Sequence, residues 1–210
     1  RGTAQSMMLP PVVLRILRFF AIAYLLVLLM ISFLENRLIF FPSRTPYVSW
    51  APPTPGGEDV AFAADDGTQL VGWYLPHPEP AAVVLFMNGN GGNVTHWRET
   101  FAILHRRCRA TIFGFDYRGY GRSAGSPSER GVLADARAAR RVLAEKAGLP
   151  ENQIVLMGRS IGGAVAIDLA QDGPRAVVVE NAFTSLPDVA ARSEACRAVN
   201  EGRSRRSTSL

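Results

Sequence analysis

The stretch IVLMGRSIGGAVAIDLA, residues 154–170, decides the fold that we expect for this chain. A β-branched run precedes the motif Gly-x-Ser-x-Gly and a helical run follows it, so the stretch predicts a strand, a sharp turn and a helix. Gly158 and Gly162 leave no Cβ where the incoming strand and the outgoing helix come closest. Ser160 would therefore stand on a strained bend, the arrangement known as a nucleophile elbow.

The predicted bend gives the serine a chemical use. A serine hydroxyl is a weak nucleophile, so a fold that uses one must present Oγ to a base and to a substrate. At the start of the predicted helix, the backbone N–H of Ile161 can point at a developing oxyanion. The alternative is a tight strand-to-helix turn that contains a serine by chance. We favour the elbow because the motif lies between a strand pattern and a helix pattern.

A second loop offers further backbone donors. Residues 88–93 read NGNGGN and directly follow the apolar run 82–87, which has the length and composition of a strand covered on both faces. The glycines allow backbone N–H groups to approach a substrate oxygen closely. We expect this loop to form the second half of an oxyanion hole, and Asn93 can also cap the following helix.

Strand and helix patterns alternate along the middle of the chain. Two strand patterns flank Asp65-Asp66-Gly67 and predict a hairpin, and two later ones predict further strands; they cover residues 58–64, 68–75, 111–115 and 176–180. Ser126, with Pro127 and Glu129 after it, predicts the start of a helix that stops at Gly148. The alternation predicts an α/β fold with a mostly parallel sheet, helices on both faces and an N-terminal hairpin.

The N-terminal part differs in character. Residues 16–34 are almost wholly apolar, which is about the length that a bilayer requires of a helix. A cleavable signal peptide is the rival interpretation, but the apolar run is long and no A-x-A site follows it. We expect a membrane anchor within residues 1–37, one transmembrane helix that contacts the lipid bilayer and leaves the folded domain on the extracytoplasmic side. Residues 38–57, rich in aromatics, proline and glycine, predict a linker to the domain.

The amino-acid composition argues against several classes of function. The two cysteines and three histidines stand apart along the chain, which predicts neither a disulfide framework nor a metal site, and we expect no cofactor. The net charge of +5 comes from scattered arginines, with one dense run at residues 203–206 and no aromatics among them. We therefore expect no nucleic-acid partner. Nothing in the sequence determines the oligomeric state.

Three segments together resemble a known family. Residues 116–129, which read DYRGYGRSAGSPSE, the elbow and ENAFTS at residues 180–185 look like the alpha/beta-hydrolase superfamily. Within it the chain is similar to membrane-anchored serine hydrolases described as alpha/beta hydrolase domain-containing proteins, and LIFFP at residues 38–42 fits that group. The resemblance implies the alpha/beta-hydrolase fold, Ser160 as the nucleophile, and the N–H groups of Ile161 and Asn90 as the oxyanion hole.

Two positions near these segments need comment. Many relatives have a histidine where this chain has Asn88, a difference that could alter the position of the loop without removing its backbone donors. For Asp116 and Arg118 we expect a structural salt bridge or hydrogen-bond network, not catalysis.

The family pattern breaks after the elbow. In the family the acid and the histidine follow the serine, whereas the three histidines here, at positions 77, 96 and 105, precede it, and we expect surface or capping roles for them. Among the later carboxylates, Glu180 at a strand end is the candidate to face the site. From about residue 191 the composition is typical of disorder, so we expect a partial hydrolase domain at residues 58–190 that is truncated at its C-terminus.

These features support a serine hydrolase that acts on ester, thioester or amide bonds of a small acyl substrate through an acyl-enzyme on Ser160. We expect little or no turnover from this chain, because it lacks the acid and histidine of a triad. The alternative is a non-catalytic, membrane-tethered binding or scaffold protein with a degenerate hydrolase core.

Overall fold

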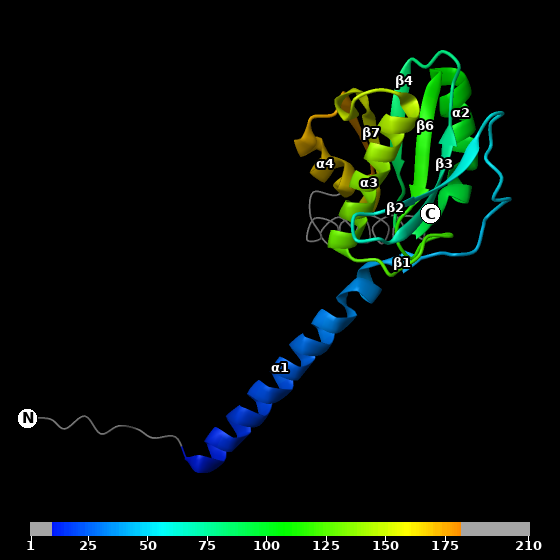
Figure 1. Cartoon of the computed structure of the whole chain (residues 1–210). Helices are drawn as coiled ribbons and strands as arrows, with labels where there is room; N and C mark the ends of the chain where they lie inside the picture. Colours follow the sequence, from blue (N-terminus) through cyan, green and yellow to red (C-terminus); the bar gives the residue numbers. More distant parts are fainter. Residues whose placement is uncertain (1–9, 182–210) are drawn as a thin grey trace, which may run out of the picture. The chain divides into compact units, whose positions relative to one another are not determined.

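A computed structural model describes residues 10–181 of the chain (Figure 1). The chain divides into two compact units, one that ends at Ile39 and one that begins at Phe40. The residues after 181, which include the expected disordered tail and the ENAFTS motif beyond Asn181, lie outside the described part.

In the first unit the described residues, 10–39, form one helix, α1 (Pro11–Ile39). Its 29 residues extend beyond the predicted apolar run at both ends, and most of the large apolar side chains of that run are exposed. By length and composition α1 could cross a membrane, and a signal sequence near an N-terminus has the same properties.

The second unit is built on a six-stranded sheet. In chain order its strands are β2 (Glu58–Ala63), β3 (Gln69–Leu75), β4 (Ala82–Met87), β6 (Ala110–Asp116), β7 (Val155–Arg159) and β8 (Ala176–Glu180). Their order across the sheet is β2-β3-β6-β4-β7-β8. The hairpin of β2 and β3 pairs antiparallel to β6, and the pairs from β6 to β8 are parallel. The predicted hairpin and mostly parallel sheet are confirmed.

Helices cover both faces of this sheet (Figure 1). On one face lies α2 (Arg98–Cys108), and on the other lie α3 (Glu129–Ala147) and α4 (Ile161–Leu169). Beneath α2, the fully buried rings of Phe101, Trp73 and Phe86 pack together, with ring centroids 5.1 Å apart for Phe86 and Phe101. Gly114 of β6 lies under the Phe101 ring, where a larger residue would collide with it. The described part of this unit, residues 40–181, also contains three short 3₁₀ helices: η1 (Val94–Trp97), η2 (Glu151–Gln153) and η3 (Ala170–Asp172).

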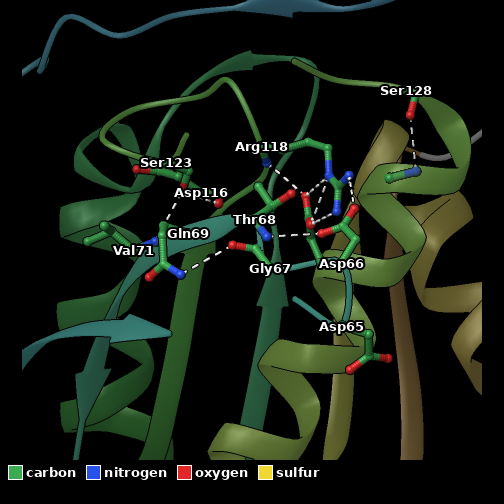
Figure 2. Close-up of polar contacts among 12 residues, drawn as sticks. Asp65, Asp66, Gly67, Thr68, Gln69, Val71, Asp116, Arg118, Ser123 and Ser128 are labelled. Atoms are coloured by element: carbon green, nitrogen blue, oxygen red, sulfur yellow. Dashed lines mark hydrogen bonds and ion pairs between the residues drawn. The ribbon is translucent and has the colours of Figure 1, made fainter. Parts of the chain in front are cut away.

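Helix α3 begins two residues later than the sequence predicted. Its N-cap is Ser128, whose Oγ accepts a hydrogen bond of 3.2 Å from the N–H of Gly131 (Figure 2). The predicted cap, Ser126, was wrong. Pro127 stays in the preceding loop against Gly119, where an added Cβ would stand 2.8 Å from the proline Cδ. The predicted stop at Gly148 is confirmed, since this residue has φ +65° and caps the helix C-terminus.

The segment expected as a linker is also different in the structure. From Phe40 onwards it belongs to the same compact unit as the sheet, and Phe40 itself is buried. Strand β1 (Phe41–Pro42) pairs in parallel with β5 (Gly91–Gly92) in the loop after β4. Proline and glycine predict irregular backbone, but they carry no information about whether that backbone packs against a domain.

Candidate active site

Ser160 occupies a sharp bend between a strand and a helix. Strand β7 ends at Arg159, α4 begins at Ile161, and Ser160 between them has φ +55° and ψ −120°. A positive φ is strained for a residue with a Cβ and occurs mainly where the surrounding structure requires it. Ser160 is half-buried, so its hydroxyl is not enclosed in the core. The structure therefore has a strand, a sharp bend and a helix at this motif.

Glycines permit the close approach around this bend. A Cβ on Gly158 would overlap the carbonyl oxygen of Gly162, and a Cβ on Gly162 would overlap the carbonyl oxygen of Met87. Both obstacles are backbone atoms, which cannot rotate away as a side chain can. The two glycines therefore allow α4 to start directly against the ends of β7 and β4.

The structure brings the NGNGGN loop beside the elbow. Strands β4 and β7 pair in parallel with Met87 opposite Gly158, so the loop after β4 and the elbow after β7 emerge at the same sheet edge. A Cβ added to Gly89 would stand 3.5 Å from the Ser160 Cβ. Ile161, as the first residue of α4, has an N–H without an acceptor inside the helix. The nucleophile candidate and both donor segments of the expected oxyanion hole are thus adjacent.

The first residue of this loop is held from the neighbouring strand. Asn88 is buried, and its Nδ2 donates to the carbonyl oxygen of Phe115 at 2.8 Å. The Tyr117 hydroxyl donates to the Asn88 carbonyl oxygen at 3.3 Å. Asn88 thus ties the loop to the end of β6.

The far end of the loop is fixed by capping. The Asn93 side chain accepts a hydrogen bond of 3.1 Å from the Thr95 N–H, and the His96 Nδ1 accepts one of 3.2 Å from the Asn93 N–H. This reciprocal pair caps η1. The expected capping roles of Asn93 and His96 are confirmed, although the helix that Asn93 caps is a short 3₁₀ turn before α2.

Asp116, at the end of β6, supports the same region. Its Oδ1 accepts a hydrogen bond of 2.8 Å from the Val94 N–H. Burial raises the pKa of Asp116 to about 7. The carboxyl group therefore serves the loop after β4 as a buried acceptor, consistent with the structural role that we expected.

Arg118 is the centre of a salt-bridge network (Figure 2). Its guanidinium donates to both carboxylate oxygens of the fully buried Asp135, with Nη2 2.7 Å from Oδ1, and its Nη1 lies 2.7 Å from Asp66 Oδ2. The hydrogen bond from Arg118 to Asp66 holds the pKa of the Asp66 carboxyl well below its usual range. The predicted structural role of Arg118 is confirmed, since the network ties the loop after β6 to α3 and to the hairpin turn.

The other two histidines lie together, away from the described elbow contacts. The rings of His77 and His105 are 4.9 Å apart, His77 Nδ1 accepts from the Glu79 N–H at 3.1 Å, and His105 Nε2 lies 2.9 Å from the Pro76 carbonyl oxygen. Within residues 10–181, no group of three or more histidine, cysteine or acidic side chains is placed to hold a metal ion.

Glu180 lies beside the elbow but its carboxylate is engaged. Its Oε1 is 3.4 Å from Arg159 Nη1, and the Arg159 guanidinium lies over the Trp97 ring, 5.1 Å from its centroid. The Glu180 carbonyl oxygen accepts a hydrogen bond of 3.0 Å from the Ser160 N–H. The structure therefore uses Glu180 to hold the elbow through its backbone and through Arg159.

Two contacts of the loop were not predicted. The Asn90 Oδ1 accepts hydrogen bonds from the Phe41 N–H at 3.0 Å and from the Tyr120 hydroxyl at 2.8 Å. Phe41 lies 49 positions away in the chain, so no local pattern could reveal it. For Tyr120 the available signal was a tyrosine between two glycines in a segment already singled out.

Comparison with known proteins identifies a family and relatives that this chain resembles. The sequence model of the alpha/beta hydrolase family matches residues 84–206. An uncharacterized protein of Mycobacterium tuberculosis is 42% identical over 160 residues, which cover 75% of this chain and 57% of the relative. The alpha/beta hydrolase domain-containing protein WAV2 of Arabidopsis thaliana is 34% identical over 174 residues, which cover 78% of this chain and 56% of that protein.

Solved structures share the fold. The Pyrococcus furiosus esterase Pf2001 superposes with a TM-score of 0.61 at 21% identity, over 76% of this chain and 62% of the esterase. The chain thus spans somewhat more than half the length of the curated relatives above. The match of the family sequence model and the hydrolase fold of residues 40–181 agree: the chain belongs to the alpha/beta hydrolase family.

Proposed function

We propose that the chain carries the nucleophile and oxyanion hole of a serine hydrolase that acts on ester, thioester or amide bonds. The observation that carries this proposal is the positive φ of Ser160 at the β7–α4 junction, with Gly89 against it. Gly89 belongs to the NGNGGN loop, residues 88–93, which we call the donor loop. The esterase among the structural neighbours supports the reaction class by fold alone.

In the proposed reaction, Ser160 Oγ forms a bond to the substrate carbonyl carbon and the carbonyl π electrons move to the oxygen. The N–H groups of Ile161 and Asn90 donate to that oxyanion. Collapse of the tetrahedral intermediate breaks the bond to the leaving group, which takes up the proton lost from Oγ, and leaves an acyl-enzyme. Water then attacks the acyl carbon, the bond between that carbon and Ser160 Oγ breaks, and a proton from the water returns to Oγ as the acid is released.

The proton transfers need a base that the described site does not present. No histidine follows Ser160 in the 210 residues, and the three that precede it have the contacts described above. We therefore expect this chain to turn substrate over slowly, and only where Ser160 attacks an activated ester whose leaving group departs without help from a general acid.

The test is hydrolysis of an activated aryl ester by the chain and by its Ser160→Ala variant. We expect a small rate that disappears in the variant, with both proteins showing the same thermal unfolding. Gly173→Ala, a strained change at a positive-φ position outside the elbow, controls for loss of rate through loss of folded protein. A rate equal in the chain and in Ser160→Ala would contradict the nucleophile role.

The second candidate is a membrane-tethered binding or scaffold protein with a degenerate hydrolase core. The contacts of the described histidines favour it, because the rings of His77, His96 and His105 are each bonded to backbone groups of their own surroundings. It predicts a cooperatively folded chain whose Ser160 does not react with any acylating or phosphonylating reagent. Serine reactivity above that of a free serine peptide therefore separates the two candidates.

We also propose that α1 anchors the chain in a lipid bilayer, with the second unit on the extracytoplasmic side. The support is the length of α1 and its run of exposed apolar side chains. Protease treatment of sealed, right-side-out vesicles should digest the second unit. Protection of that unit until the vesicles are lysed would reverse the topology, and recovery in a carbonate wash would contradict anchoring.

A further inference from the structure

The side chain of Asn90 is held from two separate parts of the chain, and this carries an inference that rests on the proposed function. Its Oδ1 accepts from the Phe41 N–H at 3.0 Å and from the Tyr120 hydroxyl at 2.8 Å. Tyr120 is 2% exposed, and burial raises the pKa of its hydroxyl to about 12, so the hydroxyl keeps the proton that it donates.

Phe41 begins a segment, residues 41–47, that we call the strap. Its first two residues pair in parallel with β5, Phe41 opposite Gly91 and Pro42 opposite Gly92. Further along, the carbonyl oxygens of Ser43 and Thr45 accept from Asn93 Nδ2 at 3.3 Å and 2.8 Å. The strap is therefore bonded to the donor loop from Asn90 to Asn93.

The strap continues past the loop and contacts η1. The N–H of Tyr47 donates to Thr95 Oγ1 at 2.8 Å. The Tyr47 ring stacks on His96, with ring centroids 5.1 Å apart, and His96 is the side chain that caps η1. Contacts at both ends give the strap a fixed register along the donor loop.

The strap is also bonded to the loop after β6. The carbonyl oxygen of Ser43 accepts from the Gly121 N–H at 2.9 Å, next to Tyr120 in the chain. Ser43 thus accepts from Gly121 on one side and from Asn93 on the other. The strap joins the two loops that follow β4 and β6.

These contacts restrict a donor loop whose own residues allow many backbone conformations. Three of its six residues are glycines, at positions 89, 91 and 92, and glycine has the largest backbone freedom of any residue. An oxyanion donor works only when its N–H is fixed toward the position that the oxyanion will occupy. Bonds to the Asn90 side chain restrict the peptide groups on either side of it.

We propose that Tyr120 and the strap are positioning elements of the active site, which hold the Asn90 peptide in the orientation that an oxyanion requires. The residues directly after α1 are then part of the hydrolase site, although none of them touches substrate in the proposed reaction. Tyr120, the second tyrosine of the segment DYRGYG, thereby has a positioning role, although it takes no part in the reaction steps.

The test uses the full chain with Tyr120→Phe, which removes one hydroxyl and keeps the ring. Tyr74→Phe is the matched control, because Tyr74 is also buried and its hydroxyl donates to the Lys146 carbonyl oxygen at 3.3 Å, in contact with α3 and not with the loop. Two readouts are taken: amide hydrogen exchange of residues 88–93, and the rate of phosphonylation by an alkyl fluorophosphonate over a concentration series.

Loss of one hydrogen bond should raise exchange in residues 88–93 by roughly fivefold in Tyr120→Phe, with exchange in β7 unchanged. The limiting phosphonylation rate constant should fall by a similar factor, while the reagent concentration at half-maximal rate stays the same. Tyr74→Phe should change neither. In an Asn90→Ala background, Tyr120→Phe should have no further effect on exchange.

Unchanged loop exchange in Tyr120→Phe, or an equal rise in Tyr74→Phe, would overturn the positioning role. A weaker apparent affinity for the reagent with an unchanged limiting rate would overturn it as well. If wild-type Ser160 does not react, the proposed function fails, and the exchange measurement still decides whether Tyr120 orders the loop.

Discussion

Gly89 lies directly against Ser160, so that a Cβ added to the glycine would stand 3.5 Å from the serine Cβ. The two residues come from loops that follow adjacent parallel strands, and each loop is fixed by contacts outside itself. The elbow is held by glycines that permit backbone contact, and the donor loop is held by buried side chains of the β6 end. The residues that hold these two loops can be tested through core packing, pH dependence, salt bridges and the reactivity of Ser160.

The elbow glycines should tolerate no side chain. We expect Gly162→Ala to destabilise the fold by about 3 kcal/mol or more, because the new Cβ would overlap the backbone oxygen of Met87. Gly91→Ala is the control, since a Cβ there meets nothing within 4 Å, and its effect should stay within about 0.5 kcal/mol. Urea unfolding of both variants measures the difference, and equal midpoints would contradict the packing at the elbow.

Asp116 should make the stability depend on pH. Its pKa of about 7 in the folded state exceeds the ordinary value of 3.8, so between these values the folded chain holds a proton that the unfolded chain releases. Stability should therefore fall as pH rises from about 4 to about 7, by up to roughly 1.4 kcal/mol per pH unit, and level off above that.

The Asp116→Asn variant isolates this contribution. The amide oxygen can still accept the hydrogen bond from the Val94 N–H, but the side chain no longer titrates. We expect the fall in unfolding free energy between pH 5 and pH 7 to become smaller in the variant. An identical pH dependence in wild type and variant, measured by urea unfolding at each pH, would show that Asp116 does not titrate in this range.

The salt bridges should contribute very different amounts to the free energy of unfolding. Arg118→Met leaves the fully buried Asp135 without its guanidinium, and we expect a loss of about 3–5 kcal/mol. Arg141→Met is the matched control, because its partner Asp65 is largely exposed, and it should change stability by less than about 1 kcal/mol. Comparable losses in the two variants would contradict the role of Arg118 as the centre of a buried network.

Added imidazole should act as an external base for Ser160. We expect millimolar to molar imidazole to accelerate aryl-ester hydrolysis by the wild-type chain beyond its effect in buffer alone, because neutral imidazole can accept the Oγ proton. The gain should increase as pH rises through the pKa of imidazole and should be absent in Ser160→Ala. Equal acceleration in both proteins would mean that imidazole acts on the ester in solution and that Ser160 lacks a functional oxyanion hole.

Much of the sheet could be predicted from local patterns. The strand from Ala82 to Met87 has the bounds that its apolar run indicated, as does the strand from Ala176 to Glu180, because turn residues stand close by. Helix α4 starts at Ile161, directly after the elbow serine, as the motif predicted. Tertiary contact with β4 and β7 favours helix at Gly162 despite the poor intrinsic propensity of glycine.

The site was predictable only in part. The serine, its glycines and the donor loop form contiguous motifs whose chemistry depends on local backbone geometry. The strap could not be predicted, because a two-residue pairing such as Phe41 with Gly91 depends on contacts between distant parts of the chain. The bond between Phe41 and Asn90 is equally non-local, and the composition of residues 38–57 indicated only irregular backbone.

The most direct test of the central claim is the site of covalent modification by an alkyl fluorophosphonate. The full chain is treated for hours, digested, and analysed by peptide mass spectrometry beside Ser160→Ala. We predict one phosphonyl adduct, on Ser160, and none on the corresponding peptide of the variant. An unmodified Ser160 peptide after prolonged treatment, in a chain that unfolds cooperatively, would contradict the role of Ser160 as a nucleophile.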